Sequence, residues 1–120
     1  MSSTSRTSVL LQSVRLLVAY LFWRTTGFKP LGRTLIHALE AREPVRQFAG
    51  ILLVRARHHS IPLLREALRA RFQLPIVLTI LADIGIPSLE TEITVFLEDV
   101  DPGVAHAARE AIKSLNALTH

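Results

Sequence analysis

The sequence predicts an all-α fold: a right-handed α-α superhelix of about three helical hairpins, preceded by an N-terminal helix. Three observations lead to this fold class. Apolar residues recur at helical spacing, similar apolar slots return every 29 residues from residue 31 onward, and a proline opens the second helix of each hairpin. β-branched residues lie inside apolar runs that helix signals flank, so no segment is typical of a strand.

The amino-acid composition excludes several classes of protein. The chain has 120 residues, enough for one domain, and its 49% apolar and 20% charged residues argue against wholesale disorder. It contains no Cys, which excludes a disulfide scaffold, thiolate chemistry and Cys-ligated zinc, and agrees with a reducing compartment. No apolar run reaches 18 residues, so we expect no transmembrane span. We expect a cytoplasmic protein, with peripheral attachment to a membrane left open.

The N-terminal part divides into two segments. Residues 1–8 are small and polar and predict a disordered tail, and residues 9–30 predict an apolar helix over about 9–24 with a connector. One stripe of this helix has helical period and is expected to cover the open end of the stack: Leu10, Val14, Leu17 and Leu21. The alternative is an interfacial segment for an anionic membrane surface or a hydrophobic partner, formed by Arg15, Tyr20, Phe22, Trp23, Arg24 and Lys29.

Residues 31–120 predict a repeat domain. Leu35 is followed by Leu64 and then by Ile93 at intervals of 29 residues, and the slots three and four residues beyond them are apolar too. Helices are expected at about 31–41, 44–57, 61–71, 75–84, 89–99 and 102–117. The prolines that open the second helices of the hairpins are Pro44, Pro75 and Pro102.

The second helices carry the pattern that buries one face of a helix. Val45, Phe48, Ala49 and Leu52 stand at i, i+3, i+4 and i+7, and the helix after Asp101 repeats this spacing. Gly85 is expected to end the central second helix, and Asp101 to cap the last one. Small residues allow helices to approach closely, and three are expected at helix contacts: Ala49, Ala67 and Ala108.

Two stretches resemble bacterial HEAT repeats of the short, phycobilisome-lyase-like kind: ALEAREPVRQFAGILLVRA and ILADIGIPSLETEITVFLEDVDPGVAHAAREAIKSL. Val45, Arg46, Ala49 and Leu53 are similar to the V-R-x-x-A-x-x-x-L pattern of the family's second helix. The resemblance covers residues 31–117 and implies a stacked solenoid. It also implies a concave side lined by second helices, where extended ligands dock.

Charge is distributed unevenly along the chain. Residues 1–71 hold twelve Lys and Arg against three Asp and Glu, a net charge of +9, whereas residues 72–120 hold two against seven, a net charge of −5. The second helices place mostly cationic side chains outside their buried stripes, which predicts a groove for an acidic segment of a partner protein. The residues of this predicted concave groove are Arg46, Gln47, Arg55, Thr79, His106, Arg109 and Lys113.

No residue pattern indicates catalysis, and we predict no enzyme, no cofactor and no metal. His58 and His59 point about 100° apart on a helix, a poor geometry for one ion, and no H-x-x-x-H or H-E-x-x-H spacing occurs. We therefore expect a noncatalytic protein–protein interaction module, a small scaffold or adaptor, with homo-oligomerisation left open. The alternative is an electrostatic binder of nucleic acid or of an anionic membrane through the Arg-rich N-terminal two thirds.

Overall fold

The computed structural model describes residues 2–119, and it describes side chains over residues 7–118. Within residues 2–119 the chain forms seven α-helices and three short 3-10 helices and no strand, which confirms the all-α prediction. The helices fall into two compact units, residues 1–63 and 64–120, and the division lies inside α4 (Ile61–Arg69).

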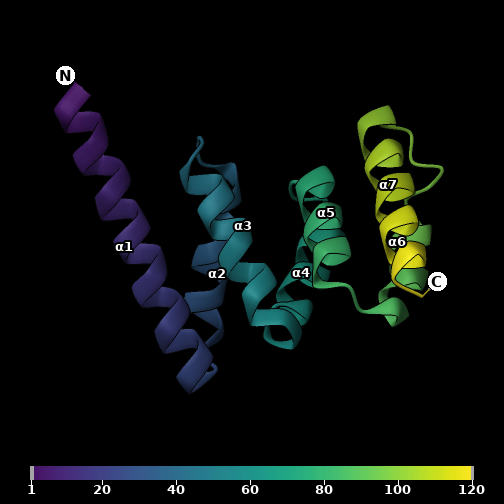
Figure 1. The fold of residues 1–120 in the computed structure, drawn as a ribbon, viewed down its shortest axis with the longest axis horizontal. Helices are drawn as coiled ribbons and strands as arrows, with labels where there is room; N and C mark the ends of the chain where they lie inside the picture. Colours follow the sequence, from purple (N-terminus) through teal and green to yellow (C-terminus); the bar gives the residue numbers. More distant parts are fainter. Residues whose placement is uncertain (1, 120) are drawn as a thin grey trace. The chain divides into compact units, whose positions relative to one another are not determined.

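The first unit is built on the long N-terminal helix (Figure 1). Helix α1 packs against α2 and α3, which also pack against each other. Before α4, its elements are α1 (Ser2–Thr26), α2 (Lys29–His37), η1 (Ala38–Glu40), α3 (Val45–Ala56) and η2 (Arg57–His59).

Helix α1 begins earlier than the sequence predicts. Residues 2–8 form its first turns, which differs from the disordered tail predicted for residues 1–8; Met1 lies outside the described residues. Extending an existing helix fixes one residue for each hydrogen bond gained, whereas nucleation fixes several. Once the apolar part of α1 has formed, the helix can therefore extend into residues 2–8, although these small polar residues have modest helix propensity.

The predicted buried stripe of α1 is wrong. Its four members, Leu10, Val14, Leu17 and Leu21, are all exposed. The buried face consists instead of Leu16, Ala19 and Trp23. Helix α1 is apolar on two sides, so periodicity alone does not decide which side faces α2 and α3.

A glycine lets α2 approach α1 closely. A Cβ atom on Gly32 would lie 2.7 Å from Trp23 Cε2 and would collide with Leu63 Cδ1. Because both neighbours are buried side chains of the same unit, only a residue without a side chain fits at this position. The indole of Trp23 thus occupies the space that a larger residue at position 32 would fill.

In the second unit, α7 packs against α5, α6 and η3 (Figure 1). After α4, its elements are α5 (Leu74–Ile84), η3 (Pro87–Leu89), α6 (Glu90–Thr94) and α7 (Pro102–Thr119). Gly85 ends α5 with φ +74°, a left-handed conformation that suits glycine, as predicted. The predicted cap at Asp101 is confirmed too, because Asp101 Oδ1 accepts a hydrogen bond from the Gly103 backbone N–H at 2.9 Å.

Helix α6 is shorter than the helix predicted over 89–99. It ends at Thr94, whose hydroxyl donates to the Glu90 carbonyl at 2.7 Å. The chain continues in tighter turns: the Phe96 N–H bonds to the Ile93 carbonyl, three residues back, at 2.9 Å. Residues 93–95 are all β-branched, and such residues lose side-chain freedom in an α-helix.

The residues at 29-residue intervals share one environment within their own units. Leu35, Leu64 and Ile93 are all fully buried. Ala49 and Ala108 are fully buried as well, and Ala67 nearly so, as expected for small residues at helix contacts. The repeated slots are therefore core positions in both units.

Candidate functional site

The structure places the seven residues of the predicted concave groove on both units. Arg46, Gln47 and Arg55 lie on α3 in the first unit; the others, in the second, are Thr79 on α5 and His106, Arg109 and Lys113 on α7. Six of the seven are exposed, and Arg46 is half-buried. A groove shared by all seven stays a prediction.

Several of these side chains are engaged locally. Arg46 Nε donates to Glu43 Oε1 at 2.8 Å, and Lys113 Nζ lies 3.5 Å from Glu110 Oε1. Among residues 7–118, no carboxylate forms an ion pair with Arg55 or Arg109. The predicted set thus contains two arginines whose charge is uncompensated.

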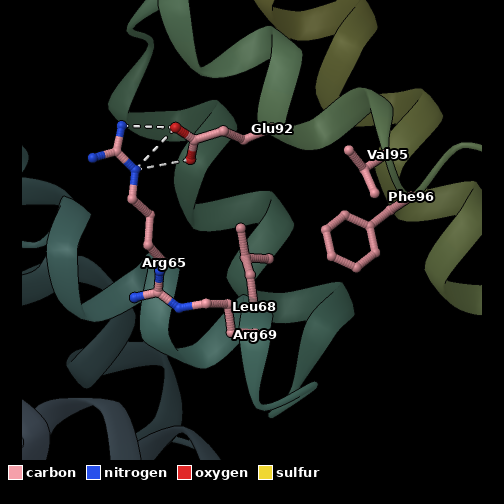
Figure 2. Close-up of a pocket in the computed structure, with 6 residues that line it drawn as sticks. All are labelled: Arg65, Leu68, Arg69, Glu92, Val95 and Phe96. Carbon is pink, nitrogen blue, oxygen red and sulfur yellow. Dashed lines mark hydrogen bonds and ion pairs between the residues drawn. The ribbon is translucent and has the colours of Figure 1, made fainter.

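A hollow of about 370 Å³ lies in the second unit, on a surface that the sequence does not predict as a site. Figure 2 shows its two sides, one from α4 and the other from α6 and the turn after it. We call it the α4–α6 groove, and its lining residues are Arg65, Leu68, Arg69, Glu92, Val95 and Phe96. Leu68, Val95 and Phe96 make it apolar, and three ionisable groups border it.

An ion pair closes one side of the α4–α6 groove. Arg65 Nη2 lies 2.7 Å from Glu92 Oε1, and Arg65 Nε donates to both carboxylate oxygens at 2.9 and 3.0 Å (Figure 2). The hydrogen bond to Glu92, and then its charge, raise the pKa of Arg65 above its ordinary value. Glu92 therefore neutralises Arg65 and holds its guanidinium in place.

Arg69 supplies the uncompensated charge of the groove. It stands one turn after Arg65 on α4 and is exposed. No carboxylate among residues 7–118 forms an ion pair with it. An apolar hollow with one free guanidinium can take an apolar group that carries a carboxylate beside it.

A second ion pair fixes the turn that follows α6. Arg71 Nη2 lies 2.9 Å from Asp99 Oδ2 and 3.0 Å from Oδ1, and the Asp101 N–H donates to Asp99 Oδ2 at 3.1 Å. The hydrogen bond from Arg71, followed by that from Asp101, lowers the pKa of Asp99 below its ordinary value. Val95 and Phe96 come just before this turn and line the groove. The Arg71–Asp99 ion pair therefore supports that side of the groove.

The sequence shows one feature of this groove, although it does not predict a site there. The i, i+4 spacing of Arg65 and Arg69 is visible as two cations on one helix face. The residues that face them come from another element 27 residues later, and no local pattern reveals that pairing. The 29-residue repeat is the one signal that could have suggested it, because it aligns Arg65 with Thr94 beside Val95.

The histidine cluster of the first unit makes structural contacts. Arg24 Nη1 lies 2.8 Å from His59 Nδ1, and the Trp23 ring meets the His59 ring edge-on at a centroid distance of 6.3 Å. Since a guanidinium only donates, Nδ1 accepts and the His59 ring proton is assigned to Nε2. Among the described residues, no three His, Cys, Asp or Glu side chains come close enough together to hold a metal ion.

The comparisons with known proteins give no match. The chain matches no protein-family model, no curated protein and no solved structure.

Proposed function

We propose that the chain is a noncatalytic protein-interaction module, a small scaffold or adaptor of stacked HEAT-like hairpins. Its ligand in this proposal is a segment of a partner protein that carries an acidic residue next to an apolar one. The observation that supports the proposal is the α4–α6 groove, in which Arg69, without an ion pair among the described side chains, stands beside Leu68, Val95 and Phe96. The 29-residue interval between the buried Leu35, Leu64 and Ile93 supports the stacked hairpins.

The chemistry of the groove favours a peptide. A hollow of about 370 Å³ has the size of a small ligand site and accepts one or two side chains. Arg69 offers a planar fork of donors that fits a carboxylate, and the apolar wall holds the neighbouring side chain. Val95 is 75% exposed, so an apolar ligand would remove a large unpartnered surface from water.

Nucleic acid fits this groove less well. A phosphate backbone needs a track of several cations, and stacking of bases needs exposed aromatic faces. The groove offers one uncompensated guanidinium and the carboxylate of Glu92, and its one aromatic ring, Phe96, is half-buried.

Selection from a random peptide library, with the full chain as target, tests the proposal. We expect enriched peptides in which Asp or Glu adjoins a large apolar residue. Arg69→Glu should weaken their binding about tenfold or more, since a hydrogen bond to a charged group contributes about 1.5–3 kcal/mol. Val95→Asp should weaken it too, because it adds a negative charge to the wall. Isothermal titration with synthetic copies of the peptides measures both effects.

Arg109→Glu is the matched control, because Arg109 is another exposed arginine of the second unit that has no ion pair among residues 7–118. It should leave the affinity unchanged within twofold. Equal affinity of the wild-type chain and Arg69→Glu for every selected peptide would refute the groove as the site. Loss of binding in the Arg46→Glu/Arg55→Glu double variant alone would instead support the concave groove predicted from the sequence.

A further inference from the structure

Helix α1 presents a continuous apolar face to solvent. Seven large apolar side chains on it are between 41% and 65% exposed. They are Leu10, Leu11, Val14, Leu17, Val18, Leu21 and Phe22. Contiguous exposed apolar patches of this size are uncommon on proteins that have no partner at that surface.

The helical geometry places these seven residues together. At 100° per residue they fall within an arc of roughly 140° that contains no charged residue. The arc lies opposite the buried side chains of Leu16, Ala19 and Trp23, which pack toward the rest of the first unit. The buried face of α1 already packs against α2 and α3. The exposed apolar face is therefore free to bind a surface outside the chain.

The charges around this face all have one sign. Arg15 and Arg24 stand at its two edges on the helical projection, and Lys29 follows at the start of α2. No Asp or Glu precedes Glu40 in the sequence. The partner of Arg24 is the neutral acceptor Nδ1 of His59, so its positive charge is not cancelled. The face is therefore apolar in the middle and cationic at its edges.

We propose that α1 lies on an anionic membrane surface, with the seven apolar side chains in the headgroup region and the cations against acidic lipids. This arrangement is that of an interfacial helix, which combines an apolar face with flanking Lys and Arg. The helix lies on the membrane and does not cross it: among the described residues, no helix has the length and apolar character for a span.

A second copy of the chain fits this face less well. Leu10, Val14, Leu17 and Leu21 have the 4-3-4 spacing of a coiled-coil seam, but they extend over fewer than two heptads. Pairing two such faces would bring only cations to the edges of the seam, and like charges repel. Acidic lipids supply the opposite charge and need no register, which is why the membrane is the occupant we commit to.

Co-sedimentation of the full chain with vesicles tests this inference. One set of vesicles is pure phosphatidylcholine, and the other contains about one third phosphatidylglycerol. We expect binding to the second set, with weaker binding at high salt because salt screens the cations. Equal binding to both sets, or no binding to either, would overturn the proposal. A dimer whose assembly requires Leu17 and Leu21, with no vesicle binding, would assign the face to a second copy instead.

Variants on α1, each paired with a control variant on α3, distinguish binding through the α1 face from nonspecific binding to vesicles. Leu17→Ser/Leu21→Ser should lower vesicle affinity about tenfold or more, whereas Ile51→Ser, at an exposed apolar residue of α3, should not. Arg15→Glu should lower it about tenfold, because it replaces attraction by repulsion, and Arg55→Glu should lower it less. All five positions are exposed, so each variant should keep the wild-type circular dichroism and melting temperature. Equal loss in each variant and its control would contradict the proposal.

The absence of Cys allows a direct readout of contact with lipid. A single Leu17→Cys variant labelled with an environment-sensitive dye should show a blue shift when anionic vesicles are added. The Ile51→Cys variant, labelled in the same way, should show none. These measurements need no peptide ligand, so failure here leaves the α4–α6 groove untouched, and failure of the peptide selection leaves this inference untouched.

Discussion

Arg71 Nη2 donates hydrogen bonds to both carboxylate oxygens of Asp99, at 2.9 and 3.0 Å, although the two residues are 28 positions apart in the sequence. Arg65 also donates to both carboxylate oxygens of Glu92, through Nε at 2.9 and 3.0 Å, across 27 residues. The first pair joins the turn just after α4 to the turn after α6, and the second joins α4 to α6 itself. These ion pairs set the distance between the two sides of the α4–α6 groove. Ionic contacts therefore stabilise the groove together with the packing of its apolar residues.

The first prediction concerns pH. The pKa of Asp99 is lowered by Arg71 in the folded chain, so its ionised form stabilises folding above the unfolded value of about 3.9. That contribution disappears as the pH falls through the lower folded value. In Arg71→Gln, the Asp99 midpoint should rise, with only the Asp101 N–H still favouring ionisation. Titration of the Asp99 carboxyl carbon by NMR measures both midpoints.

A matching stability measurement completes this test. The difference in urea midpoint between the wild-type chain and Arg71→Gln should be largest near neutral pH and should shrink below about pH 4. Identical Asp99 midpoints in both chains would show that the ion pair is absent in solution.

The second prediction concerns packing in the second unit. Ala108 is fully buried on α7, and Ala108→Leu should overpack the core and lower the free energy of unfolding by about 1–3 kcal/mol. Ala117→Leu on the same helix is the control: Ala117 is exposed, so its substitution should change stability by less than about 0.5 kcal/mol. Thermal unfolding followed by circular dichroism compares the two. Equal melting temperatures for the two variants would mean that α7 packs through another face.

The sequence predicts the helices well because its local signals are strong. Pro30 and Pro75 stand in the first turns of α2 and α5, and α7 begins at Pro102. Each proline presets φ and lacks the N–H that a helix start leaves unbonded. One exception is α6, where three consecutive β-branched residues end the helix at Thr94. Where α6 ends depends on the balance of several weak conformational preferences of its residues. The helical spacing of apolar residues does not show this balance.

The binding surfaces are less predictable for a different reason. In α1, both Leu17 on one side and Leu16 on the other have helical neighbours of apolar character. The side that α2 and α3 cover is decided by tertiary packing, which buries Leu16 and leaves Leu17 exposed. In the α4–α6 groove, Arg69 and Phe96 line one hollow only because separate elements fold together.

The third prediction concerns the approach of α2 to α1. Gly32→Ala should lower the free energy of unfolding by about 1–3 kcal/mol, because the new methyl group would overlap the Trp23 ring and Leu63. Leu63→Ala in the same chain should recover part of this loss, so the double variant should be more stable than the sum of the single effects implies. Strict additivity in urea unfolding would contradict the close contact.

The last prediction concerns a buried hydroxyl. Ser60 is fully buried, and its Oγ donates to the Leu53 carbonyl at 2.5 Å, near the end of α3. Ser60→Ala leaves that carbonyl without this donor and should lower the free energy of unfolding by about 1–3 kcal/mol. Thr79→Ala is the control, since the Thr79 hydroxyl also donates to a backbone carbonyl, that of Pro75, but is exposed to water. Its loss should change stability by less than about 0.5 kcal/mol. Urea unfolding of the three chains measures the contrast, and a Thr79→Ala effect as large as that of Ser60→Ala would show that burial does not set the cost.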